Sequence, residues 1–286
     1  MNQQTNTAAH WIEAQIVGKR QWTENLFTLQ IDAPQIHFSA GQFASLALPS
    51  LPEENNTESM TARPYSFLNP PDVAPHEFLI ARIADGALTP RLARLEVGDT
   101  IGIGNAYGFF GCDEPPPAEN LWMIAGGAGI APYLSLLRTV APWQKFGHIV
   151  LVHGVRYANE LVYRDVIASI NAAHHGTFTY LPLVSRERNS FADDIAAIVT
   201  AGRITVALQS GVLERKAGKT MEAHNAQVML CGNQSMIEEI QAFLKERGMR
   251  RHRRRMPGQI TVESYLQSGV AGGADFGAAA RSFNVA

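Results

Sequence analysis

Three consecutive prolines at 115–117 divide the chain into two parts with different patterns. Proline fixes φ and lacks a backbone N–H, so such a run continues neither a helix nor a central strand. We therefore place the main domain boundary here. The predicted divisions are a mobile N-terminus over 1–10, a first domain over 11–114, a second domain over 115–266 and a C-terminal extension over 267–286.

The first part is a series of short strand-like segments. AQIVGKRQW, LFTLQIDA, QFASLALP, ARPYSFLN and HEFLIARIA combine β-branched or aromatic residues with rough alternation. TPRLARL predicts a short helix, and EVGDTIGIG predicts a return to strand. Many short strands within roughly 100 residues indicate a small antiparallel β-barrel.

After the prolines, continuous apolar runs alternate with amphipathic segments. The apolar runs are LWMIA, HIVLVHG, TYLPLVS and QVMLCGN, and the helical segments are YLSLLRTV, NELVYRDVIASINAA and SMIEEIQAFLKERG. Strands buried on both faces read as continuous apolar runs, and helices connect parallel strands. This part therefore predicts an α/β domain whose parallel sheet is covered by helices on both faces.

Composition narrows the function classes. A hydrophobic fraction of 46% allows sizeable cores, and a net charge of −2 gives no general affinity for nucleic acid. Two distant cysteines, Cys112 and Cys231, form no disulfide or metal framework. No signal-peptide pattern or long apolar span is present, so we expect a cytoplasmic monomer that binds neither membrane nor metal.

A glycine-rich turn, GGAGIAP at 126–132, follows the first apolar run of the second part and opens a helix. Small residues let a backbone approach a pyrophosphate, and the helix N-terminus stabilises its charge. The spacing is not GxGxxG, so the turn alone fits either a nucleotide site or tight βα packing. Arg156 follows LVHGV and Arg186 follows LPLVS, and the guanidinium groups of Arg186 and Arg203 could hold a 2′-phosphate and select NADPH. Each arginine taken alone also fits a solvated ion pair.

Arg63-Pro64-Tyr65-Ser66 ends a strand of the first part. A tyrosine ring can stack on a flat cofactor, a serine hydroxyl can hydrogen-bond it, and an arginine can bind a phosphate. On its own the tetrapeptide also fits an ordinary amphipathic strand.

Together, eight segments in order resemble the ferredoxin–NADP reductase family, in particular its bacterial ferredoxin/flavodoxin–NADP reductases. They are RPYSFLNPP, DGALTPRLARLEVGD, GGAGIAP, VHGVRYANEL, LVSRE, AGRI, MLCGN and PGQITVESY, and they cover about residues 11–265. The resemblance implies an FAD-binding antiparallel barrel and an NADP-binding α/β domain. It also implies hydride exchange between NADPH and FAD, and one-electron exchange with ferredoxin or flavodoxin.

The resemblance implies a role for each matching residue. Arg63 would contact the FAD diphosphate, Tyr65 would pack on the flavin, and Ser66 would lie near its N5 atom. The implied FAD residues are Arg63, Pro64, Tyr65, Ser66, Ala87, Leu88, Thr89, Gly127, Ala128 and Tyr265. The implied NADP residues are Arg156, Ser185, Arg186, Arg203, Gly232, Asn233 and Gln234.

Four residues would serve catalysis: Ser66, Cys231, Glu263 and Tyr265. Cys231 and Glu263 would guide the nicotinamide and manage protons, and Tyr265 would cover the second flavin face until nicotinamide displaces it. Without the resemblance, Cys231 fits a buried strand thiol better.

The chain also departs from the family pattern. Ala128 replaces a common Thr or Ser, Leu266 stands where the bacterial relatives have Trp, and the segment between LVSRE and AGRI is longer. The chain also continues past Tyr265 to residue 286, and either Phe276 or Phe283 could fold over FAD. The Gly/Ala-rich composition of this extension favours a disordered tail.

A basic segment precedes the last predicted strand, and its arginines are Arg250, Arg251, Arg253, Arg254 and Arg255. The resemblance places it near the flavin edge, where it would dock an acidic ferredoxin or flavodoxin. A solvated charge run and a nucleic-acid contact are the alternatives, and aromatic residues typical of the latter are lacking.

Two other functions fit the same scaffold. One is an NAD(P)H:flavin reductase or an oxygenase-component reductase, although no Cys-rich iron–sulfur segment supports the latter. The other is a regulatory flavoprotein without enzyme activity.

Overall fold

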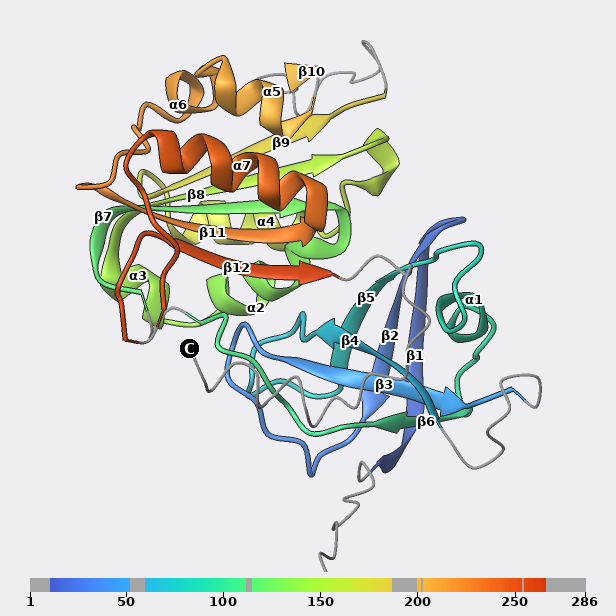
Figure 1. Cartoon of the computed structure of the whole chain (residues 1–286). Coiled ribbons are helices and arrows are strands. Elements are labelled where there is room, and N and C mark those ends of the chain that lie inside the picture. Colours follow the sequence, from blue (N-terminus) through green and yellow to red (C-terminus); the bar gives the residue numbers. More distant parts are fainter. Residues whose placement is uncertain are drawn as a thin grey trace, which may run out of the picture.

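The computed structural model describes residues 11–51, 60–111, 115–186, 200–201, 203–253 and 255–265, with backbone alone for 200, 201 and 265. Two lobes are visible, each built on its own sheet (Figure 1). We call residues 11–111 the first lobe and residues 115–265 the second lobe.

The first lobe contains six antiparallel strands in the order β4-β3-β6-β1-β2-β5. The strands are β1 (Ile12–Thr23), β2 (Leu26–Asp32), β3 (Phe43–Pro49), β4 (Met60–Ser66), β5 (His76–Ala81) and β6 (Thr100–Ile103). A bridge between Phe67 and Phe78 joins the two outer strands, so the sheet curls on itself without closing fully. The predicted antiparallel barrel is confirmed in this barrel-like form, and the predicted short helix is α1 (Thr89–Leu92).

The second lobe contains a parallel sheet in the order β10-β9-β8-β7-β11-β12. The strands are β7 (Ala118–Gly126), β8 (Phe146–Val155), β9 (Phe178–Val184), β10 (Thr200–Ala201), β11 (Ala226–Asn233) and β12 (Ile260–Tyr265). Successive residues of β7 enter different cores: Leu121 and Met123 enter one, Trp122 and Ile124 the other. Strand side chains alternate between faces, so a continuous apolar run buries both faces of the sheet.

Helices cover both faces, as predicted (Figure 1). One face carries α2 (Ala131–Leu137), α3 (Ala141–Lys145) and α4 (Arg164–Ala173), and the other carries α5 (Ile204–Gln209), α6 (Val212–Ala217) and α7 (Gln234–Glu246). Short 3₁₀ turns, η2 (Gly127–Ile130) and η3 (Ala158–Glu160), precede α2 and α4. Among the described helices, none has the length and apolarity needed to cross a bilayer.

The helix predicted in NELVYRDVIASINAA is shorter than expected. Tyr163 has a left-handed backbone, with φ 57° and ψ 32°, and α4 begins only at Arg164. The residues before it form η3 instead. A left-handed residue interrupts a right-handed helix, so periodicity alone could not locate this start.

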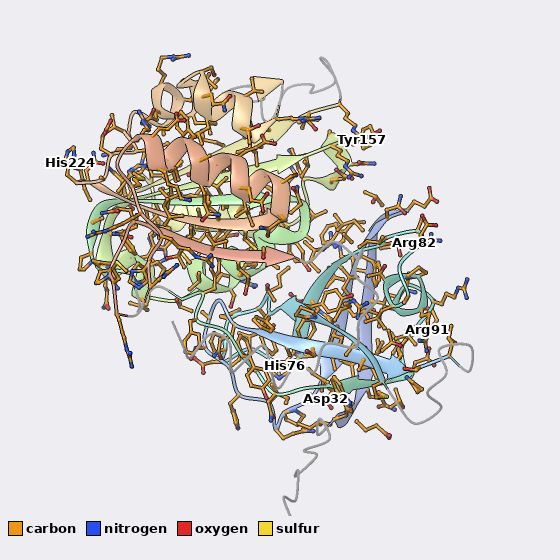
Figure 2. The ribbon with its side chains drawn as sticks, in the orientation of Figure 1. Asp32, His76, Arg82, Arg91, Tyr157 and His224 are labelled. Carbon is orange, nitrogen blue, oxygen red and sulfur yellow. The ribbon has the colours of Figure 1, made fainter. Side chains whose placement is uncertain are left out.

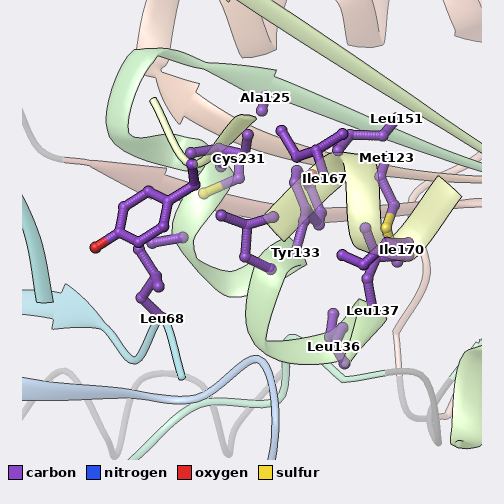
Figure 3. Close-up of a cluster of buried hydrophobic side chains, with 14 of the residues drawn as sticks. Leu68, Met123, Ala125, Tyr133, Leu136, Leu137, Leu151, Ile167, Ile170 and Cys231 are labelled. Carbon is purple, nitrogen blue, oxygen red and sulfur yellow. The ribbon is translucent and has the colours of Figure 1, made fainter. Parts of the chain in front are cut away.

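The two lobes share one apolar core. Leu26, Leu68, Leu79 and Phe110 of the first lobe belong to the same buried cluster as Tyr133 of α2. Figure 3 shows Leu68 among the side chains of this cluster. Hydrogen bonds also cross the boundary, because Ser135 Oγ donates to the Asn69 carbonyl at 2.8 Å and Arg138 donates to the Leu68 carbonyl. The lobes therefore pack against each other as one body.

Candidate functional site

Three of the predicted catalytic residues meet where the lobes join. Ser66 ends β4, Cys231 lies near the end of β11, and Glu263 lies opposite Cys231 in β12. The Ser66 hydroxyl donates to Glu263 Oε2 at 3.1 Å, and Cys231 Sγ lies 3.8 Å from the same oxygen. One carboxylate oxygen thus binds donors from both lobes.

Burial raises the pKa of Glu263 from 4.5 to about 7, although the hydrogen bonds from Ser66 and Cys231 favour the carboxylate. Desolvation disfavours a charged carboxylate, and it outweighs the two donors here. Glu263 therefore changes protonation near neutral pH. A group that does so can accept or release a proton under physiological conditions.

Tyr65 and Arg63 lie beside this cluster on β4. They lie two positions apart in the strand, so both project from the same face. The half-buried Tyr65 ring packs against the first-lobe core, and burial raises the pKa of its hydroxyl despite the nearby Arg63. Arg63 is exposed and donates to the Ala62 carbonyl at 2.7 Å, and Pro64 between them is half-buried. A flat ring and an exposed cation thus share one face of β4 just before Ser66.

The glycine-rich turn packs backbone to backbone against β11. A Cβ on Gly129 would lie 2.5 Å from the Cys231 carbonyl oxygen, and one on Gly232 would lie 3.2 Å from Gly126 N. Gly127 is exposed with φ 55°, and nothing lies within 4 Å of the position of its Cβ. Tight packing of the turn on the neighbouring strand β11 therefore explains the glycine at 129. It does not explain Gly127, whose Cβ position faces open space.

Asn233 and Gln234 follow Gly232 at the start of α7. Asn233 Oδ1 accepts from Met236 N at 2.9 Å and caps the helix, and Gln234 donates to Glu238 at 2.6 Å. Asparagine is a preferred helix cap because its oxygen satisfies an unpaired backbone N–H. Both residues are exposed beside the glycine-rich turn.

Sequence reasoning missed His153, which lies fully buried in β8. Its Nε2 is 3.0 Å from the Gly127 carbonyl oxygen, and its Nδ1 is 3.4 Å from the Tyr180 hydroxyl. Burial lowers the pKa of His153 to about 4, so the ring is neutral and Nε2 carries the proton that Gly127 accepts. The one signal in the sequence was that this histidine interrupts the apolar run HIVLVHG, where a polar ring needs a hydrogen-bond partner.

The predicted NADP arginines gather at the carboxyl end of the parallel sheet. Arg186 N donates to the Arg156 carbonyl at 2.9 Å, and Ser185 N and Oγ donate to the Val155 carbonyl at 3.0 and 3.1 Å. The side chains of Arg156, Ser185 and Arg186 are exposed. Figure 2 shows Tyr157, the neighbour of Arg156, at this end.

Arg203 reaches the same end by a different route. It precedes α5, and the next residue, Ile204, packs on β8: a Cβ on Gly154 would lie 2.4 Å from Ile204 Cγ1. Gly154 lies one residue before the end of β8. The exposed Arg203 therefore lies over the strand that leads into Arg156.

The turn Ala87-Leu88-Thr89 lies in the first lobe. Thr89 Oγ1 accepts from Ile83 N at 2.9 Å and lies 3.3 Å from the Ile83 carbonyl, so it fixes the turn before α1. Leu88 is buried and Ala87 is exposed. Their side chains are apolar, so a polar ligand contact here would use the backbone.

The basic segment lies at the other end of the second lobe. Arg250 lines a pocket of about 270 Å³ with His224, Pro117 and Gly258, and Arg250, Arg251, Arg253 and Arg255 are exposed. In Figure 2, His224 and Tyr157 lie at opposite ends of this lobe. The segment precedes β12, whereas Glu263 lies roughly 10 Å along that strand.

Several predictions fall outside the described residues. They concern Cys112, Arg254, the Tyr265 side chain, Leu266, Phe276, Phe283 and the extension over 267–286.

Comparisons with known proteins agree with this geometry. Residues 123–242 match the oxidoreductase NAD-binding domain family. A flavodoxin/ferredoxin–NADP reductase of Buchnera aphidicola (subspecies Schizaphis graminum) is 38% identical over 260 residues, which is 89% of this chain and 98% of that protein. The Escherichia coli flavodoxin/ferredoxin–NADP reductase is 39% identical over 234 residues, which is 82% of this chain and 89% of that protein.

A solved structure is similar throughout. The ferredoxin NADP+ reductase from Neisseria gonorrhoeae, determined with bound FAD and NADP, has a TM-score of 0.81 and 28% identity, covering 91% of this chain and 100% of that one. The Malassezia yamatoensis flavohemoglobin, at 20% identity and a TM-score of 0.68, shares only the fold. On the identity and coverage of the curated relatives, the chain belongs to the flavodoxin/ferredoxin–NADP reductase family.

Proposed function

We propose that this protein is an FAD-dependent ferredoxin/flavodoxin–NADP+ reductase. It exchanges hydride between NADPH and FAD, and single electrons with ferredoxin or flavodoxin. The observation that carries the proposal is the contact of Ser66 and Cys231, from different lobes, with the Glu263 carboxylate. Hydride exchange needs two cofactors to meet, and this cluster lies where the two lobes meet.

The first lobe fits FAD. Tyr65 offers a flat face next to the Ser66 hydroxyl, and Arg63 is positioned on the same strand to bind a diphosphate. The exposed turn at Ala87 adds backbone groups for the diphosphate. The remaining FAD residues are Pro64, Leu88, Thr89, Gly127, Ala128 and Tyr265.

The second lobe fits NADP(H). Gly127 leaves space for a close approach to the glycine-rich turn, and Asn233 and Gln234 flank it. Arg186 and Arg203 bind the 2′-phosphate, while Arg156 and Ser185 complete the site at the ends of β8 and β9. These exposed cations favour NADPH over NADH because only NADPH carries the extra phosphate.

When bound, the flavin supplies the chemistry that converts a two-electron donor into a one-electron source. The protein residues orient and protect that chemistry. The Glu263 carboxylate accepts a hydrogen bond from the Ser66 hydroxyl and so fixes the orientation of that hydroxyl. Because its pKa is about 7, Glu263 also exchanges protons with the site at working pH. Cys231 packs beside it and keeps water from one side. Tyr265 ends β12, and the family resemblance assigns its ring to the second flavin face.

Protein acceptors dock on the arginines of the basic segment, Arg250, Arg251, Arg253, Arg254 and Arg255. We also infer a cytoplasmic monomer with the domain limits given above.

The test is stopped-flow mixing of the purified protein with NADPH or NADH, with and without residues 267–286. We expect a yellow protein whose flavin absorbance is bleached by NADPH much faster than by NADH, and electron transfer to flavodoxin or ferredoxin. A protein without flavin, or one that is not bleached, contradicts the proposal. Reduction of free flavin at rates above those with protein acceptors would favour the flavin reductase alternative.

A further inference from the structure

Tyr163 combines an unfavourable backbone with an unusual location. It is the one non-glycine residue with positive φ among the described residues, and it lies directly before α4. A left-handed conformation is disfavoured for residues with a Cβ, so tertiary contacts must maintain it. Its side chain is buried. The contacts of that side chain therefore explain why the backbone is held there.

Those contacts cross from the second lobe to the first. The Tyr163 hydroxyl lies 2.8 Å from Thr28 Oγ1 in β2, and the Tyr163 ring lies 4.8 Å from the Trp22 ring. Trp22 Nε1 donates to the same Thr28 oxygen at 2.9 Å, and the Arg20 guanidinium lies 3.5 Å from the Trp22 ring centre. Tyr163 thus packs into a polar and aromatic site on the barrel, formed by Thr28, Trp22 and Arg20.

The chain segment that ends at Tyr163 begins in the NADP site. The Glu160 carboxylate accepts from Arg156 N at 2.8 Å and from Tyr157 N at 3.1 Å, which tightens the turn between β8 and η3. Arg156 is in turn paired to Arg186 through the backbone. A short, internally bonded segment therefore connects the NADP arginines to the barrel strand that carries Thr28.

We propose that Tyr163 is a positioning residue that sets the orientation of the NADP-binding lobe relative to the FAD-binding lobe for hydride transfer. The inference rests on the proposed function. Hydride transfer depends steeply on the approach of the two reacting atoms, whereas each cofactor binds mainly within its own lobe. The shared apolar core keeps the lobes together, and the Tyr163 hydroxyl selects one orientation.

The test compares Tyr163→Phe with Tyr133→Phe. Tyr133 is a buried tyrosine of the same core whose hydroxyl donates to the Ile124 carbonyl within its own lobe, at 3.2 Å. Each change removes one buried hydroxyl and keeps the ring. We expect Tyr163→Phe to lower the limiting rate of flavin bleaching by NADPH about fivefold, the factor for loss of one ordinary hydrogen bond. The dissociation constants for NADPH and FAD should stay within about twofold, and Tyr133→Phe should leave the limiting rate near that of the wild type.

Thr28→Val removes the same bond from the other lobe, together with the bond that Trp22 Nε1 donates to Thr28. It should lower the limiting rate as Tyr163→Phe does, and the double variant should be no slower than the slower single variant. Equal limiting rates in Tyr163→Phe and wild type, or equal losses in the Tyr163 and Tyr133 variants, overturn the proposal. If Tyr163→Phe does not fold, the limiting rate of Thr28→Val decides. Failure of NADPH to bleach the wild type instead refutes the proposed function.

Discussion

The two ends of the parallel sheet differ in what their residues can bind. The carboxyl end gathers glycines and arginines that follow separate strands, including Gly127, Arg156 and Arg186. The other end carries a contiguous basic segment between α7 and β12. Small ligands need groups converging from several strands, and parallel sheets provide this at their carboxyl ends. A protein partner needs only a broad charged surface, which one local segment can supply.

The largest expected effect is at the carboxyl end. Glu263→Gln keeps the shape of the side chain but removes its charge and its titration. We expect the turnover number to fall about 100-fold, the scale of positioned proton-transfer groups. Stopped-flow bleaching and steady-state turnover would measure it. A loss below about threefold would show that Glu263 only packs there.

The same residue gives a pH signature. The Glu263 carboxylate accepts a hydrogen bond from the Ser66 hydroxyl, so the rate of flavin bleaching by wild type should fall as pH drops below about 7. In Glu263→Gln this fall of the rate at low pH should be lost.

Because burial raises the pKa of Glu263 from 4.5 to about 7, the folded apoprotein binds more protons than the unfolded chain between those values. The stabilisation from this group is thus present below about pH 4.5 and lost as pH rises through about 7. Urea unfolding of wild type and Glu263→Gln across this window checks the sign.

The next effect separates the two dinucleotides. Arg186→Ala removes a charge-assisted contact to the 2′-phosphate, so KM for NADPH should rise by about 10- to 100-fold. KM for NADH should stay unchanged, because NADH lacks that phosphate. Arg94→Ala, an exposed arginine of the first lobe, is the matched control. Equal rises for both dinucleotides would place Arg186 elsewhere on the nucleotide.

At the other end of the sheet, charge reversal should affect only protein acceptors. Arg251→Glu with Arg253→Glu should lower the association rate of an acidic flavodoxin or ferredoxin about tenfold at low salt, and less at high salt. Ferricyanide reduction with NADPH should be unchanged, since it needs no docking surface. Equal losses with both acceptors would mean that the basic segment supports the fold or the flavin site.

The smallest effect concerns His153 beneath the glycine-rich turn. His153→Gln keeps an N–H donor for Gly127 and should leave KM for NADPH near the wild-type value, whereas His153→Leu should raise it about fivefold. Burial lowers the pKa of His153 to about 4, so wild type loses stability as pH falls from 6.5 towards 4. Neither variant should show this loss in urea unfolding. If both variants bind NADPH as wild type does, the His153 hydrogen bond does not position the turn.

Much of the fold followed from local patterns, since alternation of residues and apolar runs report burial directly. The strands of both lobes except β10, the glycine-rich turn before α2 and helix α7 were predicted. Helices α3, α5 and α6 were not, because they are short and tertiary packing stabilises them more than their own sequence does. The start of α4 was wrong for a similar reason: contacts of Tyr163 with the distant Trp22 and Thr28 override the helical pattern.

The site was predictable residue by residue only through the resemblance. Ser66, Cys231 and Glu263 are far apart in the chain, and only the meeting of the two lobes brings them together. His153 was missed because a histidine in an apolar run looks like a simple core residue until its partner, Gly127, is known. The position of the basic segment depends on the direction of β12, and composition does not reveal the direction of a strand. The segment precedes the start of β12, whereas Glu263 lies further along that strand.

The pairing of β11 with β12 places Cys231 opposite Glu263 and Gly232 opposite Ser264. Side chains alternate along a strand, so sliding β12 by one residue would turn the carboxylate to the far face and present Val262 or Ser264 to Cys231. The register of β12 against β11 therefore determines which β12 side chain faces Cys231. Because the same slip would turn the buried Ile260 away from its core, a shift of β12 by one residue should cost activity and stability together.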